Sequence, residues 1–335
     1  MGRVFLGPLS PEDEIAIARE GLEIPPEHVF VSSGSVAIRL LLRSAELPLG
    51  ARVAIPALIC PSVPWAIRAE GMIPAFMDID ANGFWMSFDP ERLERDSVRA
   101  ILLPHLYGML HPQTGEIAAF AEDRGLPLFH DAAQSHGLTW QGQSIIRCHQ
   151  GGFVSFGAGK STTAAGGALV HGLSGSLVQK LRLDQWRRWN PYARRFLAER
   201  MGKVGTWRWY HRQPAGARAS RLQVRAANYV RRRFADFEEK RRRCWQELET
   251  ILGREVLGCG RERVSCYKFV IHRDSSAWQP PESLASLPWR RVEKYPAATP
   301  LPRYDAWKGY LYEFSTERSL AFFRGEVGDR PGGGK

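Results

Sequence analysis

The sequence has no long apolar run and no pattern of paired cysteines. No uninterrupted apolar stretch approaches the roughly 20 residues that a membrane-spanning helix needs, and residues 1–6 lack the apolar core of a signal peptide. The five cysteines are an odd number without metal-ligand spacing, which fits reduced thiols. These absences argue against a membrane-spanning protein, a disulfide scaffold and a metal site, and they favour a cytoplasmic location.

What is present is typical of a large globular chain. The chain has 335 residues, of which 44% are apolar and 11 are tryptophan, so it can bury a sizeable core and is unlike a disordered protein. Short apolar segments alternate with helical patterns, which indicates an α/β fold with a mainly parallel sheet and helices on both faces. The expected strands cover residues 29–31, 52–56, 73–80, 99–105, 126–130, 152–156, 168–170 and 264–271. The expected helices cover residues 10–21, 36–44, 61–70, 115–124, 225–252, 283–287 and 317–323.

Two polar residues follow two of these strands. Asp131 comes directly after residues 126–130, and Lys160 lies in a glycine-rich loop after residues 152–156. Open α/β sheets bind ligands at the carboxyl ends of their strands. Pyridoxal phosphate requires a lysine for covalent attachment and an acid that keeps its ring nitrogen protonated. The pair therefore predicts a pyridoxal phosphate site, the alternative being a helix-capping Asp131 and a solvated Lys160.

A second part of such a site lies nearer the amino terminus. The strand at residues 29–31 breaks at Ser32-Ser33-Gly34-Ser35, and a helix follows. Small residues at the start of a helix leave amide groups free to bind an anion. We expect Gly34 and Ser35 to bind the cofactor phosphate, although an ordinary serine-capped helix would have the same sequence.

Several motifs together resemble one known family. DAAQSHG at 131–137 and SFGAGK at 155–160 are similar to the vitamin-B6-dependent sugar aminotransferases of the DegT/DnrJ/StrS type, and residues 31–35, 53–57, 74–80 and 105–108 extend the likeness in the family's order. The resemblance implies a fold-type I, aspartate aminotransferase-like architecture with a small C-terminal α+β domain, assembled as a homodimer. We expect a large domain over residues 1–225 and a linking helix with the small domain over residues 226–335.

The resemblance also implies roles for individual residues. Ser155 would bind the cofactor phosphate, and Gln134 would lie over the cofactor ring. His136 would lie near the reactive face, or it is a structural histidine. The region near 290–304, which includes Tyr295, would contribute to the mouth of the substrate site.

Three positions depart from the family's pattern. Cys60 stands where the family usually has an aromatic ring that stacks on the cofactor, so we expect its sulfur to contact the ring. Residues 164–170 lack the glutamate that precedes the paired glycines. Gly216 stands where an asparagine would reach the cofactor phosphate of the neighbouring subunit.

Residues 180–245 form a strongly basic segment. It contains 20 lysines and arginines against 5 acidic residues, a net charge of +15, whereas the whole chain carries +11. Its most unusual part, a tryptophan- and arginine-rich insertion, covers about 180–215. It could bind nucleic acid or an anionic membrane surface, or it could be a helical insertion with a solvated arginine face. The absence of a recognised nucleic-acid fold argues against nucleic acid.

These observations predict an aminotransferase that uses pyridoxal phosphate. By resemblance it would transfer an amino group from an amino acid such as glutamate to a nucleotide-linked keto sugar in polysaccharide or natural-product biosynthesis. Two alternatives remain at this point. A dehydratase branch of the family carries histidine in place of the lysine, which Lys160 argues against. A catalytically impaired protein of this fold could instead regulate or bind polyanions or membrane surfaces, as the three departures suggest.

Overall fold

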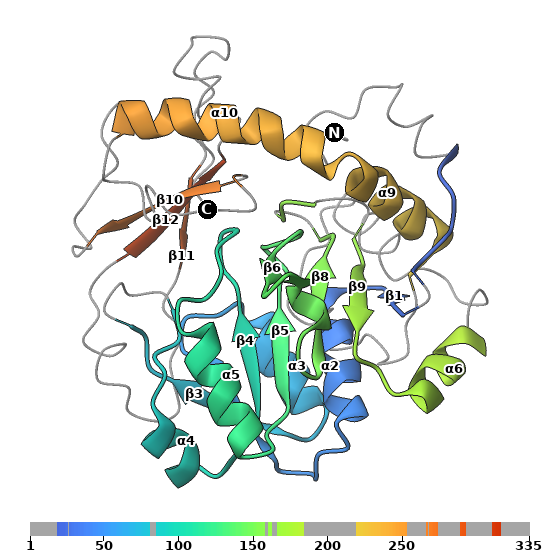
Figure 1. Cartoon of the computed structure of the whole chain (residues 1–335), viewed down its shortest axis with the longest axis vertical. Coiled ribbons are helices and arrows are strands. Elements are labelled where there is room, and N and C mark those ends of the chain that lie inside the picture. The colour runs from blue at the N-terminus through green and yellow to red at the C-terminus, as the bar shows by residue number, and fades with distance from the viewer. Residues whose placement is uncertain are drawn as a thin grey trace, which may run out of the picture.

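A seven-stranded sheet forms the centre of the molecule (Figure 1). The computed structural model describes residues 19–25, 27–80, 85–157, 160–162, 166–183, 219–252, 266, 268–273, 289–292 and 310–315. The strands of the large sheet are β1 (Val29–Val31), β2 (Arg52–Pro56), β3 (Ile73–Met77), β4 (Val98–Pro104), β5 (Leu128–Asp131), β8 (Gly151–Ser155) and β9 (Ala168–His171).

The sheet is parallel except at one strand. Its order is β1-β9-β8-β5-β4-β2-β3, and β9 runs antiparallel to both of its neighbours, β8 and β1. The remaining neighbours pair in parallel, with Asp131 of β5 opposite Pro104 of β4 and Phe153 of β8. The prediction of a mainly parallel sheet is confirmed. Because parallel strands end at the same edge, Asp131 lies at the carboxyl edge of the sheet.

Helices cover both faces of this sheet. They are α2 (Gly34–Ser44), α3 (Ser62–Ala69), α4 (Pro90–Arg95), α5 (Thr114–Asp123), α6 (Gly175–Leu183), α9 (Arg221–Arg232) and α10 (Phe234–Leu252). Period-two alternation sends neighbouring side chains of a strand to opposite faces. Phe153 packs in the core beneath α2 and α3, whereas Val154 packs in a second core beneath α9. A third core lies beneath α4 and α5.

Two helices, α9 and α10, occupy the range 225–252 for which a single helix was predicted, so the prediction of one continuous helix was wrong. Helix α9 begins at a capping box formed by Ser220 and Gln223, and it ends before Arg233. At the start of α10 the Phe234 ring packs edge-on against His136, with 4.6 Å between ring centroids. Figure 1 shows α10 running across the carboxyl edge of the strands.

The smaller elements complete the described structure. A hairpin and a short helical turn follow β5, namely β6 (Thr139–Trp140), β7 (Gln143–Ser144) and η1 (Ile145–Arg147). A separate antiparallel sheet consists of β10 (Lys268–Arg273), β12 (Tyr310–Ser315) and β11 (Trp289–Val292) in that order, and it lies under α10 in Figure 1. The strand expected at residues 264–271 corresponds to β10, which begins later.

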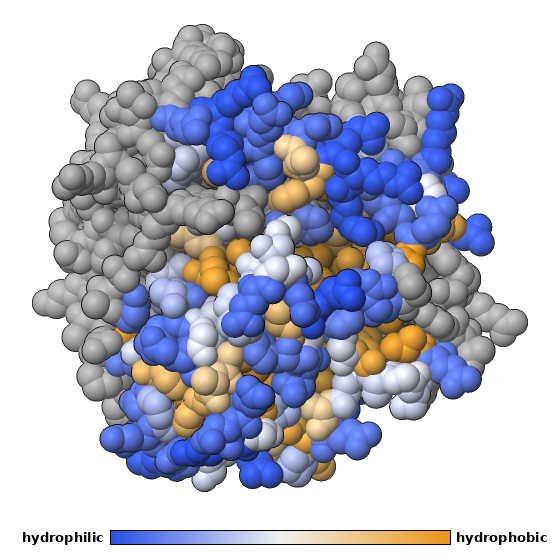
Figure 2. All heavy atoms as spheres, in the orientation of Figure 1, coloured by the Kyte–Doolittle hydropathy of each residue, from blue (hydrophilic) through white to orange (hydrophobic). Residues whose placement is uncertain are grey.

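Several predictions fall outside the described residues. These are most of the helix at 10–21, the basic insertion at 180–215 beyond α6, and the helices at 283–287 and 317–323. In the described ranges, no helix is long and apolar enough to cross a membrane. Figure 2 shows hydrophilic side chains over α9 and α10, with apolar side chains in the band beneath them.

Candidate functional site

Asp131 is a buried carboxylate at the carboxyl edge of the sheet. Its Oδ1 accepts a hydrogen bond from the Ala133 amide at 2.9 Å, and only 8% of the residue is exposed. Burial raises the pKa of Asp131, while the positive charge of Lys160 and the Ala133 amide act to lower it. Asp131 and Lys160 are therefore close enough to interact electrostatically. A buried carboxylate can stabilise a positive charge brought next to it, such as a protonated ring nitrogen.

The loops that follow β4 and β5 are joined by hydrogen bonds. The Gln134 side chain accepts a bond from the Tyr107 amide at 3.0 Å, and the Ser135 hydroxyl donates to the His105 carbonyl at 2.8 Å. Tyr107 has a φ of 54°, an uncommon value that this contact helps to hold. Gln134 is thus fixed at the same edge as Asp131, as its proposed place over a cofactor ring requires.

Gly34 and Ser155 face each other across the amino end of α2. A Cβ built on Gly34 would lie 3.6 Å from Ser155 Oγ and 3.1 Å from a Phe153 ring carbon. Ser33 caps the helix by accepting a bond from the Val36 amide at 3.3 Å. The first amides of a helix have no intrahelical acceptor, so those of Gly34 and Ser35 are available to an anion. The expected phosphate residues are therefore adjacent, in a cradle that a larger side chain would fill.

The loop that carries Lys160 is held at both sides. Thr162 Oγ1 donates to the Ser155 carbonyl at 3.0 Å, and Arg241 of α10 donates to the Ser161 carbonyl at 2.7 Å. After the loop, Gly167 has a φ of 99°, and a Cβ there would lie 2.4 Å from the Phe30 ring. Gly167, the second of the paired glycines, therefore cannot carry a side chain without colliding with the Phe30 ring.

The remaining predicted residues lie in three different places. Cys60 is exposed in the loop between β2 and α3, with its sulfur 3.2 Å from the Ser62 hydroxyl. His136 lies between the Phe156 and Phe234 rings and lines a cavity beneath α9. Tyr295 falls outside the described residues. Contact of Cys60 with a cofactor and of His136 and Tyr295 with a substrate stay predictions.

Two residues of this site were missed by sequence reasoning. Ser161 is 2% exposed, and within the described part of the chain its hydroxyl has no hydrogen-bond partner. Arg241 reaches Ser161 from a helix 80 positions further along the chain. Ser161 could have been suspected from its place beside Lys160, but no local pattern identifies Arg241 among so many arginines.

The residues present fit pyridoxal phosphate. The orphaned Ser161 hydroxyl lies next to Lys160, the Gly34 cradle offers helix-start amides and the Ser155 hydroxyl to a phosphate, and Asp131 supplies the acid that a pyridine nitrogen needs. One set of residues thus offers an amine, an acid and an anion cradle at one edge of the sheet.

Comparison with known proteins identifies relatives of the same kind. Residues 26–257 match the profile of the DegT/DnrJ/EryC1/StrS aminotransferase family. The chain is 29% identical over 228 residues to UDP-N-acetyl-3-dehydro-alpha-D-glucosamine 3-aminotransferase of Acidithiobacillus ferrooxidans, and 27% identical over 229 residues to 3-amino-5-hydroxybenzoate synthase of Amycolatopsis mediterranei. Each match covers 67% of this chain but only 57% and 55% of those relatives. The chain therefore spans little more than half the length of these two proteins.

Solved structures establish the fold. A DegT DnrJ EryC1 StrS aminotransferase from Brucella abortus superposes with a TM-score of 0.65 at 20% identity, covering 98% of this chain and 92% of that one. GDP-4-keto-6-deoxy-D-mannose-3-dehydratase of E. coli, solved with hydrated pyridoxal phosphate, gives 0.63 at 16% identity, covering 89% and 85%. The predicted fold-type I architecture is confirmed, and pyridoxal phosphate is the cofactor of these aminotransferases.

Proposed function

Because the chain belongs to the DegT/DnrJ/EryC1/StrS aminotransferase family, we propose that it is a pyridoxal phosphate-dependent aminotransferase. The amino donor is an amino acid such as glutamate, and the acceptor is a keto sugar linked to a nucleotide. One observation carries the proposal, namely that Lys160 and the buried Asp131 interact at the same sheet edge as the Gly34 and Ser155 cradle. We also propose that the enzyme is a cytoplasmic homodimer.

The cofactor would be held by residues from four segments. Lys160 would attach it covalently, Asp131 would keep its ring nitrogen protonated, and the amides of Gly34 and Ser35 with the Ser155 hydroxyl would bind its phosphate. Gln134 and Cys60 would contact its ring. When bound, pyridoxal phosphate supplies an electron sink that makes a proton on the adjacent substrate carbon removable.

Lys160 performs the proton transfer in this proposal. Its Nζ would take the proton from the α-carbon of the donor and deliver it to the cofactor within the same half-reaction, and in the second half-reaction it would carry a proton the other way, onto the acceptor carbon. Lys160 and the Ala133 amide favour the ionised form of Asp131 against the effect of its burial, and a protonated ring nitrogen on the cofactor would favour that form further. Arg241 keeps the lysine loop in place through the Ser161 carbonyl.

The acceptor is proposed from two lines of support. One relative is named for amination of a UDP-linked keto sugar, and another, from E. coli, is GDP-perosamine synthase, which is 31% identical over 142 residues, or 42% of this chain and 38% of that one. The formal net charge of +11 also suits an acidic, nucleotide-linked substrate, because long-range attraction raises its rate of encounter.

An absorbance experiment tests the cofactor and the donor. The purified protein with added pyridoxal phosphate should show the visible band of a lysine-bound cofactor, and glutamate should convert this band to the amine form. Lys160→Ala should remove the band, because no other lysine is expected to replace it. Lys240→Ala, an exposed position on α10, should leave the band unchanged. Wild-type protein that binds no cofactor would overturn the proposal.

A further inference from the structure

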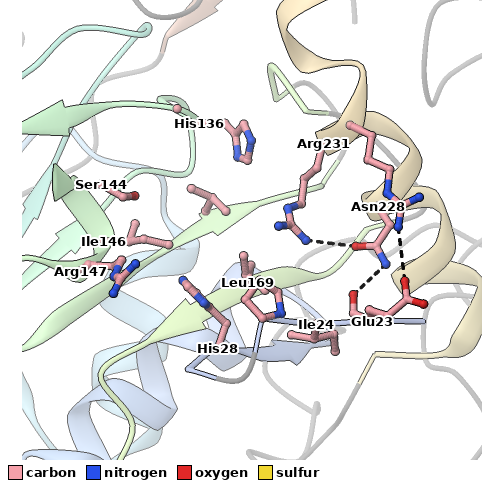
Figure 3. Close-up of a pocket in the computed structure, with 14 residues that line it drawn as sticks. Glu23, Ile24, His28, His136, Ser144, Ile146, Arg147, Leu169, Asn228 and Arg231 are labelled. Carbon is pink, nitrogen blue, oxygen red and sulfur yellow. Dashed lines mark hydrogen bonds and ion pairs between the residues drawn. The ribbon is translucent and has the colours of Figure 1, made fainter. Parts of the chain in front are cut away.

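A cavity lies beneath α9, and Gly34 and Ser155 are not among the residues that line it. It has a volume of about 720 Å³ and is lined by residues of four segments: residues 23–28, the turn and hairpin after β5, strands β8 and β9, and helix α9. Sites for small molecules usually measure about 300–1,000 Å³. Figure 3 shows that His136, Arg231, His28 and Arg147 approach the same space from different elements. We call it the α9 cavity.

Arg231 enters the α9 cavity in a fixed orientation. Asn228, which is 3% exposed, accepts a hydrogen bond from Arg231 Nη1 at 3.1 Å. The other end of the Asn228 amide donates to the carbonyls of Gly21 and Glu23 at 3.0 and 2.9 Å. These three bonds fix the Asn228 amide, which links the Arg231 guanidinium to the backbone of residues 21–23 (Figure 3).

The charge of Arg231 is not neutralised by an acid. Within the described ranges, no carboxylate lies within ion-pair distance of its guanidinium, and Asn228 is its hydrogen-bond partner. Burial lowers the pKa of Arg231, and the neighbouring charge of Arg232 lowers it further. A half-buried cation without a counter-ion is unfavourable, so an anion entering the cavity would be bound there.

Two histidines add unsatisfied nitrogens to the same cavity. The Nδ1 atoms of His136 and His28 are buried, and neither has a hydrogen-bond partner in the described structure. The His28 side chain is 8% exposed, with Glu27 Oε1 3.4 Å from its Nδ1. Burial lowers the pKa of each ring to about 4, so both are neutral at pH 7. A neutral imidazole donates one hydrogen bond, through whichever ring nitrogen carries its proton.

Three acidic side chains, Glu20, Glu23 and Glu27, lie near this group, and each is close to an arginine other than Arg231. Glu23 and Glu20 pair with Arg232 at 3.3 Å, and Glu27 lies 3.6 Å from Arg147. These pairs neutralise the outer arginines and leave the inner Arg231 to act on a ligand. The rest of the wall is largely apolar and includes Ile24, Pro25, Ile146, Val154 and Leu169.

We propose that the α9 cavity binds a small organic oxyanion, in which a phosphate or carboxylate group is attached to an apolar or ring-shaped body. The oxyanion would pair with the Arg231 guanidinium, the rings of His136 and His28 would border it, and the body would pack on Ile146 and Leu169. The volume exceeds that of a free phosphate ion, which is why an organic body belongs to the proposal. Of the residues assigned above to the Lys160 site, His136 alone lines this cavity, and the proposal does not depend on the chemistry at Lys160.

Calorimetric titration with three matched probes tests this site. Naphthyl phosphate, naphthoate and naphthol are titrated into cofactor-loaded protein from which unbound pyridoxal phosphate has been removed, so that the cradle at Gly34 is filled and the α9 cavity is free. We expect both anions to bind at least tenfold more tightly than the neutral naphthol, and the tighter of the two identifies the preferred oxyanion. Naphthol binding as tightly as both anions would overturn the proposal.

Substitutions locate the binding. Arg231→Gln should weaken the anionic probes about tenfold or more, since a hydrogen bond to a charged group is lost, and should leave naphthol unchanged. Arg221→Gln, at the exposed start of the same helix and outside the cavity lining, should change affinity by less than threefold. Ser144→Trp, at an exposed position lining the cavity, should weaken all three probes by obstruction without disturbing the core. Unchanged affinity in Arg231→Gln or in Ser144→Trp, or an equal loss in Arg221→Gln, contradicts the proposal.

Discussion

Single residues determine the room for a cofactor phosphate, and Gly34 is the clearest case. A Cβ at this position would lie 3.1 Å from the Phe153 ring and would project toward Ser155 Oγ. We expect Gly34→Ala to weaken pyridoxal phosphate affinity about tenfold, equivalent to about 1.4 kcal/mol, because the methyl group occupies the cradle. A cofactor titration followed by absorbance measures the change.

Gly115 provides the matched control for this prediction. It lies in the first turn of α5, and a Cβ there meets nothing within 4 Å. Gly115→Ala should therefore leave cofactor affinity unchanged and stabilise the protein by up to about 1 kcal/mol through helix propensity. Equal affinity of the two variants would show that Gly34 does not face the phosphate.

At the scale of elements, α10 joins the lysine loop to the C-terminal part of the chain. Arg241 donates to Glu238 at 2.6 Å as well as to the Ser161 carbonyl, and Glu238 also accepts a bond from the Cys266 amide at 2.7 Å. Glu238 is 5% exposed, so its charge depends on these partners. We expect Arg241→Gln to lower the free energy of unfolding by about 3 kcal/mol, since removing one member of a buried ion pair leaves the other uncompensated. Urea denaturation measures this.

Arg243 on the same helix separates this effect from a loss of surface charge. It is exposed and pairs with the exposed Glu239 one turn away. Arg243→Gln should change the free energy of unfolding by less than about 0.5 kcal/mol. If both variants lose the same stability, the contact of Arg241 with the lysine loop has no special importance. A faster loss of bound cofactor in Arg241→Gln alone would support the positioning role.

The elements also show how far sequence reasoning reaches. The buried parallel strands are continuous apolar runs, so β2 and β4 could be located from composition, and Asp131 followed from the end of β5. The antiparallel direction of β9 and the break before Phe234 depend on contacts with distant segments, and no local pattern encodes them. The same holds for Arg231, whose importance comes from a cavity formed by residues far apart in the sequence.

At the scale of the whole molecule, three histidines cross the sheet as one hydrogen-bonded chain. The His111 amide donates to His105 Nδ1 at 3.1 Å, so the proton of neutral His105 is on Nε2 and is donated to His130 Nδ1 at 3.0 Å. His130 Nε2 then donates to His149 Nδ1 at 2.9 Å. A proton added to any ring would remove an acceptor, so this chain requires neutral rings.

Stability should therefore fall in acid. Burial lowers the pKa of His105 well below its usual value and that of His130 to about 3, and it also lowers the pKa of His149. The unfolded chain binds these protons at a pH near 6.5, before the folded protein does, so stability is full above about pH 6.5 and is lost as the pH falls toward 3. Within that range each buried ring lowers the free energy of unfolding by about 1.4 kcal/mol for each pH unit of acidification. His105 and His130 together lower it by about 3 kcal/mol per pH unit.

Urea denaturation between pH 8 and pH 5 tests this expectation, and the free energy of unfolding should decline below pH 6.5. Asp131 acts in the opposite direction, because burial raises its pKa and the folded state then binds a proton more readily than the unfolded chain. The variant His149→Asn separates the histidine chain from other titrating groups. Its amide oxygen can still accept the His130 bond but binds no proton, so the decline should be shallower with stability at pH 8 retained. A pH-independent free energy of unfolding would mean that these histidines bind protons as readily in the folded protein as in the unfolded chain.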